Sequence, residues 1–149
     1  MPEIDLGIKH RSKYFRLEEL VDRATFQLWG EEAWTLIHPD LVLSIDGVRE
    51  FFNAPVTINN WIFGGNFQYR GYRGPQCQIG AEHSYHKRGM AVDLDIKGYD
   101  AEETRRIIIE NKNNPLFSYI QRMEDNVTWV HIDLGQIPLN KSRIYLFKI

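Results

Sequence analysis

The sequence predicts a single α+β domain in which helices pack on a small antiparallel or mixed sheet. Helical patterns gather in the first half of the chain and separated strand patterns in the second half, an order typical of α+β folds. The 149 residues are 43% hydrophobic and 26% charged, which are ordinary values for one globular domain. Because no segment repeats, is low in complexity or reads as a linker, we expect one domain spanning residues 1–149.

The first half contains three expected helical segments. Short helical pieces are predicted over Leu17–Val21 and Ala24–Trp29, and a longer helix over Pro39–Phe52. A proline suits the first turn of that helix, where a missing N–H costs no hydrogen bond. The longer helix carries one apolar stripe at positions i, i+4, i+7 and i+11, formed by Leu41, Ile45, Val48 and Phe52. This stripe indicates that the helix packs against the rest of the domain.

A strand and a long irregular segment follow this helix. The β-branched residues of Val56–Trp61, bounded by Pro55 and by the Gly64-Gly65 pair, predict a strand. The next segment, Phe63–Ser84, is rich in glycine and carries aromatic and arginine side chains. An irregular stretch of more than about 15 residues in a compact domain is usually functional or disordered. The aromatic residues argue against disorder, so we expect a functional loop.

The second half is expected to supply most of the sheet. Met90–Ile96 alternates as a strand and places two aspartates on one face. A capping-box pattern predicts a helix over Ala101–Asn111. Further strands are predicted over Val127–Leu134 and Arg143–Ile149.

Charge and cysteine content exclude several classes of function. The chain has 18 Lys and Arg against 20 Asp and Glu, so it has no basic excess, and neither nucleic acid nor a membrane surface is an expected partner. Cys77 is the single cysteine, which excludes an internal disulfide or a cysteine-cluster zinc site. The N-terminal segment lacks the apolar core of a signal peptide, and no stretch approaches the ~18 apolar residues of a membrane span. We therefore expect synthesis in the cytoplasm as a soluble protein.

Two histidines and two aspartates lie on or beside the predicted strands. His86 precedes a glycine turn into the strand that carries Asp93, and the period of two places His131 and Asp133 on one face of a second strand. Pairing these strands would bring all four side chains together. A catalytic zinc takes three nitrogen or oxygen ligands from the protein and keeps a fourth position open. Each residue also has a simpler interpretation, because single histidines are commonly hydrogen-bonded surface residues and strand aspartates commonly pair with basic side chains.

Three motifs resemble those of one enzyme family. The segment Ser84–Asp93 reads SYHKRGMAVD and resembles the SxHxxGxAxD motif of the M15 family of zinc peptidases, which includes D-alanyl-D-alanine carboxypeptidases and phage endolysins. The GYR triplet that ends at Arg73 is similar to an upstream element of that family, and Trp129–Asp133 to the segment with its last zinc histidine. Together these motifs span roughly residues 56–135. The resemblance implies the fold that this family shares with the Hedgehog signalling domain.

The resemblance also implies roles for individual residues. His86, Asp93 and His131 would bind one zinc ion per chain. Arg73 would anchor the substrate or stabilise an oxyanion, a role that Arg70 could share or replace. Contacts with the substrate are further expected from Arg70, Tyr72 and Ser84. Apart from the resemblance, four aromatic residues could line a groove for a peptide, although packing in the core or the loop is the commoner role for any one of them: Trp61, Phe67, Tyr69 and Tyr72.

The position of the general base departs from the family pattern. Many members have a glutamate three residues before the last zinc histidine, where this chain has Thr128. Threonine cannot take a proton from water at neutral pH. Glu124 is the favoured replacement and Asp133 the competing one. Asp125, and an arrangement in which Asp133 itself binds zinc, remain open.

The expected function is a zinc metallopeptidase that hydrolyses peptide bonds in peptidoglycan stem or cross-link peptides, as a D,D-carboxypeptidase or an endopeptidase of the endolysin type. Such a protein would act at the cell wall after phage-mediated release or as a virion component. The alternative is a non-catalytic module that retains zinc and binds the cell wall or serves as a phage structural part. The sequence leaves the bond cleaved, the host and the oligomeric state open.

Overall fold

The structure, a computed structural model, describes residues 11–80 and 84–149 and confirms the α+β class. Its α-helices over these residues are α1 (Arg23–Trp29), α2 (Pro39–Phe52) and α3 (Ala101–Glu110). Short 3-10 helices connect the other elements: η1 (Leu17–Glu19), η2 (Gly30–Leu36), η3 (Trp61–Phe63), η4 (Tyr85–Arg88) and η5 (Pro115–Phe117).

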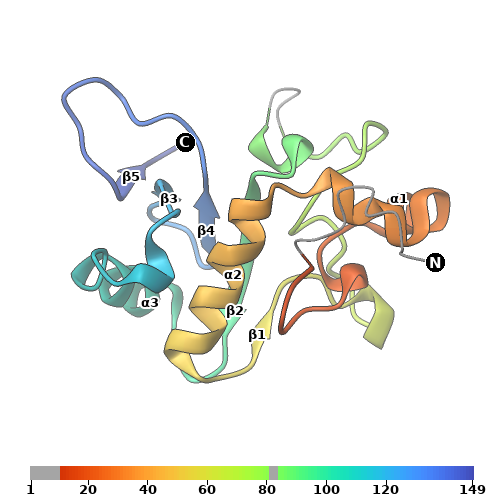
Figure 1. Ribbon diagram of the computed structural model, residues 1–149, viewed down its shortest axis with the longest axis horizontal. Helices are drawn as coiled ribbons and strands as arrows, with labels where there is room; N and C mark the ends of the chain where they lie inside the picture. Colours follow the sequence, from red (N-terminus) through yellow and green to blue (C-terminus); the bar gives the residue numbers. More distant parts are fainter. Residues whose placement is uncertain (1–10, 81–83) are drawn as a thin grey trace, which may run out of the picture.

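The strands form one mixed sheet, as the sequence predicts. They are β1 (Val56–Thr57), β2 (Ala91–Ile96), β3 (Arg122–Glu124), β4 (Val130–Asp133) and β5 (Tyr145–Phe147), in the order β1-β2-β4-β3-β5. The β1–β2, β2–β4 and β3–β4 pairs are antiparallel, whereas β3 and β5 run parallel. β2 and β4, the two strands on which the sequence places its candidate ligands, are therefore direct neighbours near the middle of the sheet (Figure 1).

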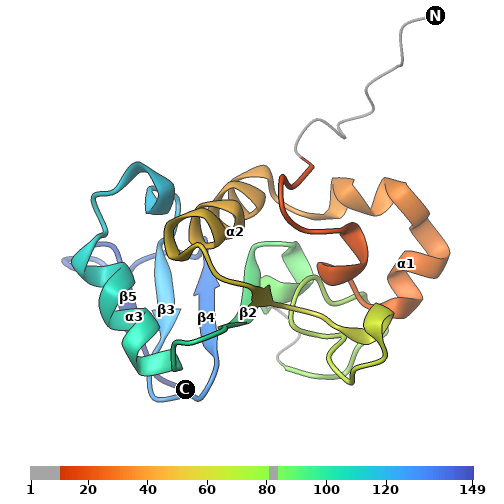
Figure 2. The same ribbon diagram turned by 90° about the horizontal axis from the view of Figure 1, so that it is seen from below.

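The main core lies between α2 and the sheet. α2 crosses one face of the sheet over β2, as two perpendicular views show (Figures 1 and 2). Ile45 and Val48 of α2 and Val92 and Leu94 of β2 belong to one hydrophobic cluster and have at most 1% of their surface exposed. Burying each of these side chains stabilises the fold by roughly 1.5–3 kcal/mol. Because side chains alternate along a strand, this packing turns Asp93 to the other face of the sheet.

The strand expected over Val56–Trp61 is wrong beyond its second residue. The reason is local hydrogen bonding by two asparagine side chains, which competes with the strand ladder. The Asn59 side chain donates to the Val21 carbonyl (3.0 Å), and the Asn60 side chain accepts from the Phe67 N–H (2.8 Å). The segment therefore leaves the sheet and continues into η3.

The other expected elements differ mainly at their ends. The three predicted α-helical segments after residue 22 agree with α1, α2 and α3 within one residue. The first helical piece is the 3-10 helix η1, the strand expected over Val127–Leu134 is shortened to β4, and that over Arg143–Ile149 to β5. β3 was not predicted, because its three residues place one apolar side chain, Met123, between two charged ones. The long loop after η3 is irregular where described, and its residues 81–83 lie outside the described part.

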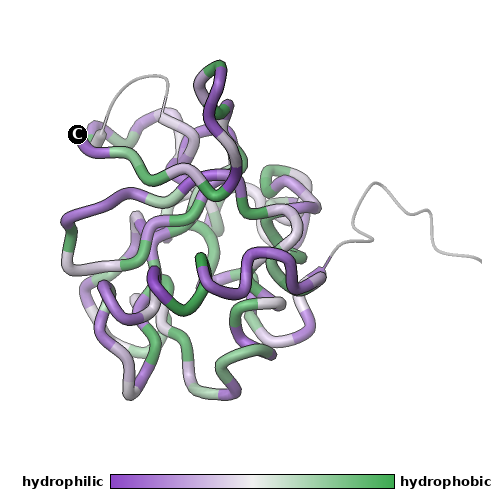
Figure 3. The backbone as a smooth tube through the Cα atoms, turned by 90° about the vertical axis from the view of Figure 1, so that its left-hand side faces the viewer, coloured by the Kyte–Doolittle hydropathy of each residue, from purple (hydrophilic) through white to green (hydrophobic). Residues whose placement is uncertain are grey.

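Hydrophobic stretches along the backbone are short and interrupted by hydrophilic ones (Figure 3). Among the described residues, no helix has both the length and the apolar character needed to cross a membrane. The N-terminal segment in which we expect no signal peptide falls largely outside the described residues.

Candidate metal centre

His86 is held by the turn that leads into β2. The turn begins at Ser84, whose hydroxyl accepts the His86 N–H at 3.2 Å, and ends at Gly89, which has a φ of 67°. A Cβ at Gly89 would collide with the Leu36 carbonyl oxygen, so both the conformation and the space require glycine. His86 Nδ1 lies 3.0 Å from the Gly71 carbonyl oxygen. This contact fixes the ring with Nε2 3.4 Å from Asp93 Oδ2.

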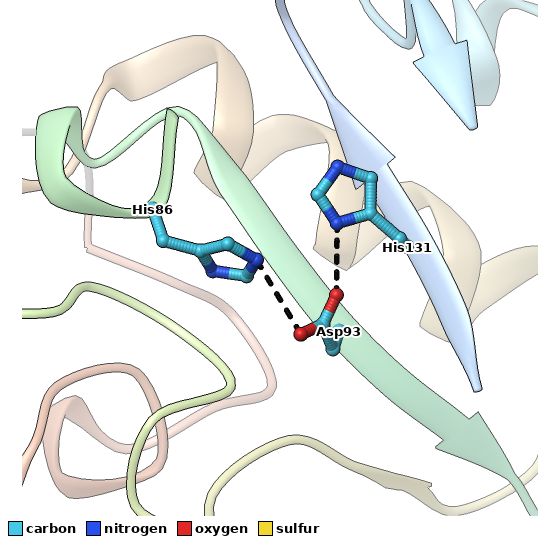
Figure 4. A group of neighbouring side chains, drawn as sticks. All are labelled: His86, Asp93 and His131. Atoms are coloured by element: carbon cyan, nitrogen blue, oxygen red, sulfur yellow. Dashed lines mark hydrogen bonds and ion pairs between the residues drawn. The ribbon is translucent and has the colours of Figure 1, made fainter. Parts of the chain in front are cut away.

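Asp93 and His131 lie side by side on two neighbouring strands. They are register partners on β2 and β4, and His131 Nδ1 lies 2.9 Å from Asp93 Oδ1. Figure 4 shows both rings directed at the aspartate from two different elements. The candidate ligand atoms of His86, Asp93 and His131 all lie within 4.8 Å of one another, and all three residues are buried. This buried His-Asp-His group could hold a metal ion.

The carboxylates of Asp93 and Asp133 determine the protonation state of His131. Burial opposes charge on Asp93, but hydrogen bonds with His131 and His86 outweigh it and hold the pKa of Asp93 well below its usual range. Burial also disfavours the charged imidazole of His131, yet hydrogen bonds to Asp133 and Asp93 raise the pKa of His131 to about 9. The metal-free protein therefore carries a His131 cation between two carboxylates at neutral pH.

This arrangement predicts a pH dependence for the metal-free protein. The pKa of His131 is raised from 6.5 to about 9, so its contribution to stability is complete below pH 6.5 and is lost as the pH rises through 9. We expect the free energy of unfolding of chelator-treated protein to fall by a few kcal/mol across this interval. Denaturant titrations between pH 6 and about 9.5 measure it. His131→Gln should flatten the profile, and an equally steep profile in that variant would assign the effect to another group.

The three candidate ligands border a cavity of about 350 Å³. Its lining also includes Arg73, Ser84, Glu124 and Asp133. Arg73 is fixed over the site by three contacts. Its Nε donates to the Tyr69 carbonyl (2.7 Å), one terminal nitrogen to the Ile79 carbonyl (3.5 Å), and the other lies 3.5 Å from Asp93 Oδ2. The structure thus brings Arg73 and Ser84 to the candidate metal group.

The two candidate bases have very different surroundings. Glu124, at the end of β3, is 7% exposed and lines the cavity. Asp133 has a fully buried side chain with four hydrogen bonds of 2.8 Å: two from Arg122, one from Gly135 N–H and one with His131 Nε2. Burial would raise the pKa of Asp133, but Arg122 and His131 hold it below its usual range. Asp133 contacts the imidazole nitrogen opposite to the one that faces Asp93.

Asp125 and Thr128 lie away from this cavity. Asp125 is 3.7 Å from Arg105 and borders a larger cavity, of about 680 Å³, against α3. Thr128 lines a third cavity, of about 300 Å³. Among the described residues, neither cavity is lined by a histidine or a cysteine. Neither cavity therefore belongs to the candidate metal centre, although one of them is larger than the cavity beside His86.

Several residues expected at the substrate site are not brought to it. Arg70 is paired with Asp95 (2.7 Å) and stacks on the Phe67 ring (4.0 Å). Tyr72 is buried in the hydrophobic core, and the Trp61 indole N–H donates to the Val21 carbonyl (2.9 Å). Neither Arg70 nor any of the four aromatic residues considered for a peptide groove is among the residues that line the cavity. The burial of Tyr72 in the core and the contact of Phe67 with Arg70 agree with the packing role that is the commoner one for such residues.

The cavity also contains residues that the sequence did not single out. Tyr85, Arg122, Trp129 and Phe147 line it. Tyr85 and Trp129 lie within the quoted motifs, next to or near the candidate ligands, and could have been selected on that ground. Arg122 and Phe147 belong to the short strands β3 and β5, whose pairing with β4 and with each other is set by the tertiary fold.

Comparison of the chain with protein-family models, with curated proteins and with solved structures found no match.

Proposed function

We propose that this protein is a zinc metallopeptidase of the M15 type that hydrolyses peptidoglycan peptides. The observation that carries the proposal is the buried group of His86, Asp93 and His131 in a cavity that also holds Glu124 and Arg73. Two imidazoles and one carboxylate are a donor set that suits zinc, and three protein ligands leave a position for water or substrate. The substrate class rests on the resemblance of the motif that begins at Ser84.

The surrounding residues fit hydrolysis of an amide bond. Zinc in such sites supplies Lewis acidity, which acidifies water and polarises a carbonyl oxygen. Glu124 would take the proton of the attacking water and pass it to the leaving amine. Arg73 would stabilise the negative charge that develops on the carbonyl oxygen, because its guanidinium is already oriented by the Tyr69 and Ile79 carbonyls.

Glu124 is a better base than Asp133 for a structural reason. All four hydrogen bonds of Asp133 occupy its two oxygens, and its side chain has no exposed surface. A water molecule would have to displace Arg122 or Gly135 to deliver a proton. Glu124 borders the cavity and forms no ion pair among the described residues. We therefore assign the base to Glu124 and the orientation of the His131 ring to Asp133.

Arg73→Ala is expected to lower kcat by about 10²–10³-fold with zinc retained, which is the usual cost of losing one oxyanion donor. Steady-state kinetics on a stem peptide, with metal content measured on the same samples, tests this. Arg70→Ala is the matched control, because Arg70 lies in the same loop but is paired with Asp95. Unchanged turnover in Arg73→Ala with a loss in Arg70→Ala would transfer the role to Arg70.

Digestion of purified cell walls, followed by mass analysis of the released muropeptides, tests the function itself. Release of a terminal residue identifies a carboxypeptidase, and opening of cross-links identifies an endopeptidase. The second candidate function is the zinc-retaining, non-catalytic wall-binding or phage structural module, which Thr128 at the usual glutamate position favours. A chain that binds zinc and sediments with walls but opens no bond supports that module.

A further inference from the structure

Arg122 occupies a position that the proposed chemistry does not use. It extends from β3, pairs with Asp133 through two hydrogen bonds of 2.8 Å, and has 19% of its side chain exposed. Both bonds run side by side to the two oxygens of one carboxylate. Such a bidentate pair fixes the plane of the carboxylate as well as its position.

Asp133 in turn holds His131. Its Oδ2 lies 2.8 Å from His131 Nε2, while Nδ1 of the same ring lies 2.9 Å from Asp93. Hydrogen bonds from Arg122 and Gly135 fix this aspartate, so its oxygen can select which nitrogen of His131 carries the proton. A proton held on Nε2 leaves the lone pair of Nδ1 for a metal ion on the side of Asp93 and His86.

The guanidinium of Arg122 is itself clamped. Its carbon atom lies 5.1 Å from the centre of the Tyr85 ring and 4.2 Å from that of Phe147. Phe147 also packs edge to face on the His131 ring, with centroids 5.5 Å apart. Tyr85 adjoins His86 in η4. The clamp therefore joins the elements that carry both candidate histidine ligands.

Gly135 is required for this close packing. A Cβ on Gly135 would lie 2.6 Å from Tyr85 Cε2 and 2.8 Å from Arg122 Nε. A Cβ atom does not approach other heavy atoms this closely in proteins. Any residue larger than glycine would therefore force the Tyr85 ring or the Arg122 guanidinium to move. The Gly135 N–H also donates to Asp133 Oδ1 at 2.8 Å. The position is shaped around the Arg122–Asp133 pair.

We propose that Arg122 is a positioning residue, which acts through Asp133 to hold His131 in the orientation and tautomer that bind the metal. This inference rests on the proposed function in that it takes zinc as the metal. Arg122→Gln is expected to weaken zinc binding by about 10–100-fold, the range found when partners of ligating histidines are lost. Arg122→Lys retains the charge but cannot form both parallel bonds, so we expect it to restore zinc binding only in part.

Competition with a chromogenic chelator measures zinc affinity, and the visible absorption of the cobalt-substituted protein reports the ligand geometry. Thermal unfolding of the metal-free proteins is recorded in parallel.

Arg143→Gln is the control for a purely structural arginine. Arg143 donates to the Ile120, Lys112 and Phe117 carbonyls and is not among the residues that line the cavity beside the candidate ligands. It should lower the unfolding temperature and leave zinc affinity and the cobalt spectrum unchanged. Gly135→Ala should shift both metal readouts in the direction of Arg122→Gln, with every charge retained.

Zinc affinity and a cobalt spectrum equal to wild type in Arg122→Gln would overturn the inference. If Arg122→Gln does not fold, wild-type metal binding in both Arg122→Lys and Gly135→Ala would overturn it equally. Full restoration by lysine would reduce the role of Arg122 to charge alone and contradict positioning. A wild-type chain that binds no zinc would instead overturn the proposed function, and this inference with it.

Discussion

Alanine in place of His86, Asp93 or His131 is expected to remove most of the bound zinc, which wild type should hold at one ion per chain. Each substitution leaves two of the three donor atoms that lie within 4.8 Å of one another, too few for a stable tetrahedral site. Metal analysis after dialysis against a weak chelator, together with circular dichroism, measures both content and folding. The variants should remain folded, because a chain of this length buries about 68–70% of its unfolded surface without help from a metal.

His38→Ala is the matched control for the metal-ligand variants. His38 is an exposed histidine whose Nδ1 accepts the Asp40 N–H at the start of α2. Its loss should cost about 1 kcal/mol of stability through the helix cap and leave the zinc content unchanged. Full zinc occupancy in all three ligand variants would contradict the assignment of the metal centre. Equal zinc loss in His38→Ala would show that the measurement follows stability rather than ligation.

The parts of the fold that could be predicted are those with a dense local pattern. The Pro39–Phe52 helix has four apolar residues in one stripe, and β2 and β4 alternate between apolar and polar side chains. The sequence predicts that the polar residues of these two strands converge if the strands pair, and the structure shows that pairing, with Asp93 opposite His131.

The parts that could not be predicted depend on partners distant in the sequence. Arg70 and Arg73 lie in one loop and have the same chemistry, so sequence reasoning left both open. Asp95, on β2, pairs with Arg70 and holds it outside the cavity, whereas Arg73 reaches Asp93. The short strand β3 has no pattern of its own, so the sequence predicts neither the burial of Asp133 nor its pairing with Arg122.

Glu124→Gln is expected to lower kcat by about 10²–10⁴-fold at full zinc content. The substitution preserves shape and removes only the oxygen that takes the proton, and general acid–base groups typically contribute a factor of this size. Turnover of a stem peptide, with metal content determined on the same protein, is the measurement. Asp125→Asn is the matched control, because Asp125 follows directly in the chain but borders a different cavity and pairs with Arg105. It should retain turnover within about twofold.

Asp133→Asn separates the two candidate bases, because the proposed roles of Glu124 and Asp133 predict different losses. An aspartate that orients His131 should, when replaced, weaken zinc binding together with turnover, since an amide cannot accept both Arg122 and His131 as a carboxylate does. A base should lose turnover alone. If Glu124→Gln is as active as wild type while Asp133→Asn is inactive and retains its zinc, Asp133 is the base and the present assignment is wrong. If wild type binds zinc and opens no bond in any wall preparation, neither Glu124 nor Asp133 is a catalytic base and the non-catalytic module becomes the supported function.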